Sequence, residues 1–139
     1  MARATDLTAL PRARIRDQLL QLLVPTDAVP AIRLIVGYGI LSPVLPELPD
    51  THPLATLAEG ETAAQIAPDP IRRLAALVPP DAAEAVGARL KLSNAQRKRL
   101  VDASAGPGDE GPAGLAYRAG VESATDRLLL AGEDPAVLD

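Results

Sequence analysis

Apolar residues recur along this chain at spacings near 3.6, the period of amphipathic helices, and not in the alternation typical of strands. The segment RIRDQLLQLLV, residues 14–24, is the first clear case. Its apolar side chains share one helical face: Ile15, Leu19, Leu22 and Leu23. Pro25 should end this helix, because proline lacks the N–H group that a continuing helix needs. The pattern predicts an all-α fold, a compact bundle of short helices with connections rich in proline and glycine.

Aspartate and proline mark the starts of two further helices. Asp27 is predicted to cap AVPAIRLIV, residues 28–36, where Pro30 lies early enough to be tolerated in the first turn. In DPIRRLAALV, Asp69 is the predicted cap and Pro70 the first helical residue. The buried stripe of this second helix should consist of Ile71, Leu74, Leu77 and Val78.

The other segments carry weaker patterns. Residues 52–67 show a helical spacing of apolar residues that Gly60 should interrupt. The remaining segments are predicted as an apolar turn at 40–50, a helix at 81–90, a loop at 104–114 and helices at 114–120 and 121–132. We find no repeat of fixed period, which argues against a solenoid.

Charge is segregated along the chain. Residues 89–99, RLKLSNAQRKR, contain five cations and no carboxylate, although the net charge of the protein is −4. Taking these five from the 14 basic residues leaves 9 against 18 acidic residues, a net charge of −9 for the rest. Ser93 and Gln96 stand three residues apart, the spacing of a capping box, so a new helix should begin there and carry the final RKR.

This basic stretch is the candidate functional feature. Arg and Lys on a rigid helix are sufficient to bind the RNA backbone, because A-form RNA is recognised mainly by shape and by backbone contacts. The alternative is a solvated helix face whose cations pair with Asp102 or with acids elsewhere. The predicted RNA-binding residues are Arg89, Lys91, Asn94, Arg97, Lys98, Arg99 and, as a weaker candidate, Arg118.

The sequence does not support a catalytic, metal-binding or cofactor-binding role. There is no cysteine, and His52 is the only histidine, so no metal cluster of these residue types can form. GPGDEG at 106–111 has the letters of a dinucleotide loop but lacks the preceding strand, and its two acids would repel phosphate. We interpret His52 as a turn residue. The carboxylate pairs Glu59 with Glu61 and Glu133 with Asp134 are interpreted as solubilising surface charge, so we expect no catalytic residue, metal or cofactor in this chain.

The length and hydropathy pattern predict one cytoplasmic, soluble unit. The 139 residues fit a single domain, and no window approaches the roughly 20 apolar residues of a membrane helix. Nor does the start of the chain have the apolar run of a secretory signal. The acidic total argues against indiscriminate binding to nucleic acid, so we expect no DNA partner.

Several segments, in order, resemble the C-terminal helical part of bacterial class II CCA-adding tRNA nucleotidyltransferases, which are similar to poly(A) polymerases. These segments are RIRDQLLQLLVPTDAVPAIRLIVGYGILSPVLPEL, DPIRRLAAL, RLKLSNAQRKRL and AYRAGVESATDRLLLAG, which together span nearly the whole chain. The first helix resembles the family's S-x-E-R-I-x-x-E-L-x-K-L segment at the end of its neck. Ala13, Gln18 and Gln21 replace the two glutamates and the lysine of that segment.

The resemblance implies a tRNA-binding region without the family's catalytic head. It makes residues 1–24 the end of a neck-like region and residues 25–139 a body-like region that holds the acceptor end of tRNA. The head's D-x-D pair, glycine-rich site and E-D-x-x-R motif do not occur here. Magnesium and CTP or ATP would therefore belong to a separate head, and this chain should not transfer nucleotides by itself. The alternatives are a helical protein-interaction module or partner subunit, or an inactive truncated remnant.

Overall fold

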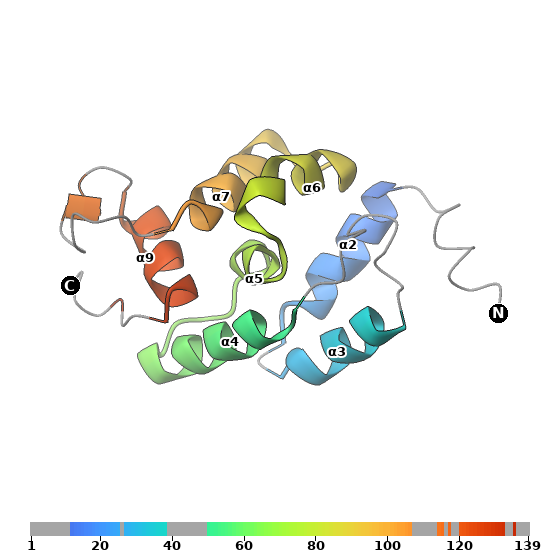
Figure 1. The fold of residues 1–139 in the computed structure, drawn as a ribbon, viewed down its shortest axis with the longest axis horizontal. Coiled ribbons are helices and arrows are strands. Elements are labelled where there is room, and N and C mark those ends of the chain that lie inside the picture. Colours follow the sequence, from blue (N-terminus) through green and yellow to red (C-terminus); the bar gives the residue numbers. More distant parts are fainter. Residues whose placement is uncertain are drawn as a thin grey trace.

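The computed structural model describes residues 12–25, 27–38, 50–106, 114–115, 117, 120–132 and 135. Within these residues every regular element is a helix, which confirms the all-α prediction (Figure 1). The elements are α2 (Arg12–Leu22), α3 (Val29–Gly37), α4 (His52–Ala64), α5 (Pro70–Leu77), the 3-10 turn η1 (Pro80–Ala82), α6 (Ala83–Arg89), α7 (Asn94–Ser104) and α9 (Val121–Leu130). No helix in the described part of the chain combines the length and the apolar character needed to cross a membrane.

Helix α5 is the centre of the bundle. Figure 1 shows it end-on, with α4 below it, α6 and α7 above, α2 and α9 on opposite sides, and it contacts α2, α4, α7 and α9. All eight residues from 71 to 78 are buried, so this helix is enclosed on every face. With no Phe or Trp in the sequence, the surrounding core is built from Leu, Ile, Val and Ala. Small side chains allow short helices to pack closely around α5.

Two helix starts follow the predicted capping chemistry. The Asp69 carboxylate accepts hydrogen bonds from the backbone N–H groups of Ile71 and Arg72, at 2.9 and 3.0 Å. At α7 the Ser93 hydroxyl accepts from the Gln96 N–H, and the Gln96 side chain accepts from the Ser93 N–H, which completes a capping box. Each device satisfies N–H groups that have no partner inside their helix.

Other local predictions were wrong. Leu22 is 38% exposed, because α2 ends there and Leu23 enters the core from the following turn. Asp27 does not cap α3, which begins after Ala28 without a side-chain cap.

Gly60 lies inside a continuous α4, where a Cβ atom would stand 3.6 Å from the Leu129 side chain. That separation is an ordinary contact distance, so packing against α9 does not require a glycine here, and Gly60 does not end the helix.

The remaining predictions concern His52 and segments that the structure describes only in part. His52 is the exposed first residue of α4 and not a turn residue. Outside the described residues lie most of the predicted turn at 40–50 and of the loop at 104–114, together with Arg118, Glu133 and Asp134. Of the predicted helix at 114–120, the structure describes residues 114, 115, 117 and 120, and the first three are helical.

Candidate nucleic-acid interface

A network of charged side chains runs through the core. Glu61 of α4 is only 1% exposed and binds two arginines of α5. Its Oε2 accepts from Arg72 Nη1 at 2.8 Å, and its Oε1 accepts from Arg73 Nε at 3.0 Å. Arg73 also donates to the backbone carbonyls of Leu23, at 3.0 Å, and Pro25. The interpretation of Glu61 as solubilising surface charge was wrong, because α4 turns this carboxylate inward onto α5.

The network continues through α9 to the basic stretch. The Asp126 Oδ1 atom accepts from Arg72 Nε at 2.8 Å, and its Oδ2 accepts from Arg99 Nε at 3.0 Å. Arg99 Nη1 then reaches the Asp69 carboxylate at 2.9 Å. Three cations thus meet three carboxylates, which compensates charges that would be costly to bury alone. We call this set the core charge network: Glu61, Asp69, Arg72, Arg73, Arg99 and Asp126.

The C-terminal end of the basic stretch is consequently surrounded by acids. The hydrogen bonds that Arg99 donates to the Asp126 carboxylate are the largest cause of a raised pKa at Arg99, and the charges of Asp126, Asp69 and Glu122 raise this pKa further. Burial opposes the shift. Lys98, whose side chain is 78% exposed, pairs with Asp102 one turn later at 2.7 Å. For Lys98 and Arg99 the structure thus shows pairing with Asp102 and with acids on other helices.

Arg97 and Asn94 lie on the face of α7 that packs against α6. Arg97 donates to the Asn94 side chain at 3.1 Å, and its Nε lies 3.8 Å from the Glu84 carboxylate. The aliphatic part of Arg97 crosses Gly87, where a Cβ atom would stand 2.9 Å from the Arg97 Cγ. Gly87 thereby leaves the space in which Arg97 rests on α6.

The N-terminal end of the stretch has a different environment. Arg89 ends α6, and Lys91 follows with a left-handed φ of 55°. The Lys91 N–H donates to the Ala88 carbonyl and the Leu92 N–H to the Gly87 carbonyl, at 3.1 and 3.0 Å. This is a Schellman ending, in which glycine usually takes the left-handed position. Within the part of the chain that the structure describes, neither Arg89 nor Lys91 has a carboxylate within 4.0 Å.

Helix α2 docks on this turn. Arg16 Nη1 donates to the Lys91 carbonyl at 2.6 Å, across 75 residues of sequence, while its Nε pairs with Asp17 at 2.9 Å. We call Arg16, Arg89 and Lys91 the corner cations. Sequence reasoning did not select Arg16, since nothing local indicates that its helix packs beside residue 91.

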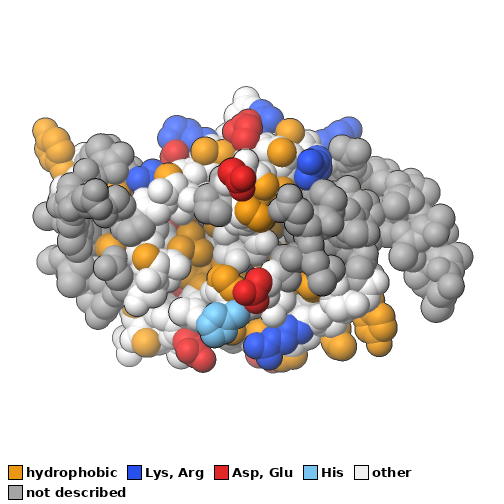
Figure 2. All heavy atoms as spheres, viewed as in Figure 1, with side chains coloured by type: hydrophobic (Ala, Val, Ile, Leu, Met, Phe, Trp, Pro, Cys, Tyr) orange, Lys and Arg blue, Asp and Glu red, His pale blue; other side chains and the backbone are white. Residues whose placement is uncertain are grey.

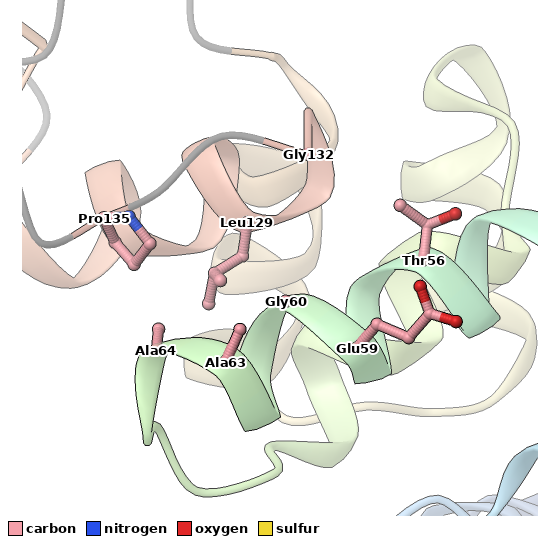
Figure 3. Close-up of a pocket in the computed structure, with 8 residues that line it drawn as sticks. All are labelled: Thr56, Glu59, Gly60, Ala63, Ala64, Leu129, Gly132 and Pro135. Atoms are coloured by element: carbon pink, nitrogen blue, oxygen red, sulfur yellow. The ribbon is translucent and has the colours of Figure 1, made fainter.

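One cavity in the described residues, between α4 and α9, has few polar groups. The cavity between α4 and α9 has a volume of about 370 Å³ and is lined mainly by small residues, with Glu59 its one charged side chain (Figure 3). Leu129 points from α9 toward Gly60 and Ala63 of α4. Among the described residues, no group of three or more His, Cys, Asp or Glu could hold a metal ion.

Comparison with known proteins gives one match. Residues 2–51 match the family model described as "Probable RNA and SrmB-binding site of polymerase A". No curated protein and no solved structure matches the chain. The match supports an RNA-binding role in a polymerase family, and the matched span includes α2 and α3.

Proposed function

We propose that this chain is the tRNA-binding helical portion of a CCA-adding nucleotidyltransferase and does not catalyse nucleotide addition by itself. Two independent signals support RNA as the ligand: the family match over residues 2–51 and the basic stretch at 89–99. The observation that carries the proposal is the 2.6 Å hydrogen bond from Arg16 to the Lys91 carbonyl. This bond connects residues 2–51, which match the family model, with the basic stretch at 89–99. It therefore supports a single RNA-binding surface that includes both segments.

Arg89 and Lys91 supply the charge for this contact, whereas Arg16 is paired with Asp17 and holds the Lys91 carbonyl. Lys91 is exposed, and Arg89 and Arg16 are partly exposed beside it. Figure 2 shows Lys and Arg side chains along the upper edge of the molecule, over α6 and α7, with Asp and Glu among them. Phosphate groups would bind where cations are not already paired, because a paired cation must first lose its carboxylate. The proposed contact is therefore centred on Arg89 and Lys91, with Arg97 and Asn94 at its margin.

The test is a salt-dependent titration of the full chain with a tRNA transcript. Each phosphate contact to a duplex should contribute roughly −0.9 to the slope of log affinity against log salt. A DNA hairpin with the same stem sequence is the control, because it lacks the 2′-hydroxyls and A-form shape expected to matter. Binding of tRNA that is insensitive to salt, or equal binding of the DNA hairpin, would contradict the proposal.

Catalysis is tested in the same preparation. Incubation with tRNA, magnesium and labelled CTP should give no incorporation, because the chain contains none of the head motifs. Addition of a separately produced catalytic head is the positive arm. Incorporation by this chain alone would refute the assignment of catalysis to another polypeptide.

A protein-interaction role is the second candidate. Four large apolar side chains are exposed on or after α2 and α3, inside a span whose family description names SrmB as well as RNA. They are Leu22, Val24, Leu34 and Tyr38. A protein partner docked there would bind with little salt dependence, since apolar burial is not screened. Leu34→Glu should then abolish binding of that partner and leave tRNA binding unchanged.

A further inference from the structure

A separate cavity lies where α4, α5, α7 and α9 meet, and its volume is about 300 Å³. Most of its wall is apolar, with Pro53, Val78 and Leu130 the larger contributors. Two polar side chains also line it, Ser104 and Arg127. Ligand sites typically combine apolar walls with a few convergent polar groups, in volumes from roughly 300 Å³ upward.

Arg127 differs from the arginines of the core charge network. It is only 7% exposed, yet among the described residues no carboxylate lies within 4.0 Å of its guanidinium. Its Nε donates to the Asp102 carbonyl at 2.6 Å, at the end of α7, while the Asp102 carboxylate binds Lys98. The Nη atoms donate to no described residue, so this guanidinium is a buried cation with donor capacity left over.

Ser104 adds a second unused group. Its hydroxyl oxygen is buried and has no hydrogen-bond partner in the described structure. A buried charge with no carboxylate partner among the described residues is unfavourable, and a bound anion would compensate it. The Ser104 hydroxyl would join that contact by turning toward the cavity, because its oxygen now exposes less than 1 Å². A guanidinium fork is well suited to the oxygens of a phosphate group.

We propose that this cavity binds one nucleotide of RNA, with its phosphate on Arg127 and Ser104 and its base and sugar against the apolar wall. The inference rests on the proposed function for the identity of the ligand, since phosphate and an apolar body are what the cavity itself selects. The volume admits a single nucleotide and no duplex. Because the described lining contains no aromatic ring for stacking, recognition should depend on the phosphate and be weakly selective for the base.

The test is an NMR titration of the full chain with AMP at fixed ionic strength, with adenosine and inorganic phosphate as separate arms. AMP should give saturable shifts at the Arg127 side chain and at amides 103–106, with a dissociation constant of about 1 mM or tighter. Adenosine should bind at least about tenfold more weakly, because it lacks the charge-assisted hydrogen bonds. Inorganic phosphate should also bind more weakly, because it makes no use of the apolar wall.

Variants assign the effect to the cavity. Arg127→Lys keeps the positive charge but loses the fork and should weaken AMP binding by about tenfold. Ala131 is exposed and lines the cavity, so a leucine there should fill part of the cavity without unfolding the protein. Because Ala131→Leu leaves Arg127 unchanged, it should abolish AMP binding by loss of space alone. Arg33→Gln removes an exposed cation on α3 and is the control that should bind AMP normally.

The inference is overturned if AMP gives no saturable shift below about 10 mM, if the shifts map elsewhere, or if Ala131→Leu binds normally. These results are separable from the proposed function, which is read from salt-dependent tRNA binding at the corner cations. Loss of the AMP site with tRNA binding intact removes only the inference. An AMP site without tRNA binding removes the proposed function and retains the cavity as a nucleotide site.

Discussion

The two ends of the basic stretch have opposite electrostatic surroundings. Arg99, near the C-terminal end, is bonded to Asp126 and Asp69, and its side chain is 23% exposed. Lys91, near the N-terminal end, is exposed and has no carboxylate within 4.0 Å among the described residues. Both residues carry a positive charge, and both lie in a segment of the sequence that contains no carboxylate. The difference shows that the cation density of a segment does not predict how much positive charge is available to a ligand.

The largest expected effect comes from breaking the core charge network. Glu61→Ala leaves Arg72 and Arg73 buried with a missing partner, and should lower the free energy of unfolding by about 3–5 kcal/mol. Glu59→Ala removes an exposed carboxylate two residues earlier and is the matched control, expected to stay within about 0.5 kcal/mol. Urea denaturation of both variants measures the difference. Equal stabilities would mean that the buried carboxylate contributes no pairing energy.

Reversing charge at the two ends tests the comparison directly. Arg89→Glu combined with Lys91→Glu should weaken tRNA binding by roughly 10- to 100-fold and reduce the salt slope by about one to two. Lys98→Glu should weaken binding by less than about threefold, because Lys98 is already paired with Asp102. Fluorescence anisotropy over a salt series measures both quantities. A larger effect of Lys98→Glu would place the RNA contact near the C-terminal end of the basic stretch and contradict a contact centred on Arg89 and Lys91.

The smallest effect isolates the side chain of Lys91 from its backbone. Glycine relieves a left-handed φ, so Lys91→Gly should raise the free energy of unfolding by about 0.5–1 kcal/mol while weakening tRNA binding. Gln65→Gly is the control, because Gln65 ends α4 with a φ of 57° and carries no charge. Both variants should be stabilised to a similar degree in thermal unfolding, and only Lys91→Gly should lose affinity. Weakening by both variants would indicate an indirect effect.

Local signals predicted much of the fold. The caps of α5 and α7 were predicted because an Asp-Pro pair and a Ser-x-x-Gln spacing satisfy backbone groups within four residues. Leu22 and Gly60 were misjudged because their environments depend on how helices meet. The spacing in α2 does not show which residue enters the core after the helix ends, and the packing of α4 against α5 and α9 keeps a continuous helix through Gly60.

The sequence by itself determined the helical periodicity, the principal caps and the segregation of charge. Tertiary structure decided which charges are neutralised, because Asp126 lies 27 residues from Arg99 and arrives on another helix. It likewise decided that Arg16 meets residue 91, across 75 residues. Hydrogen bonds and ion pairs act over a few ångströms, so their partners are settled only when packing brings distant segments together.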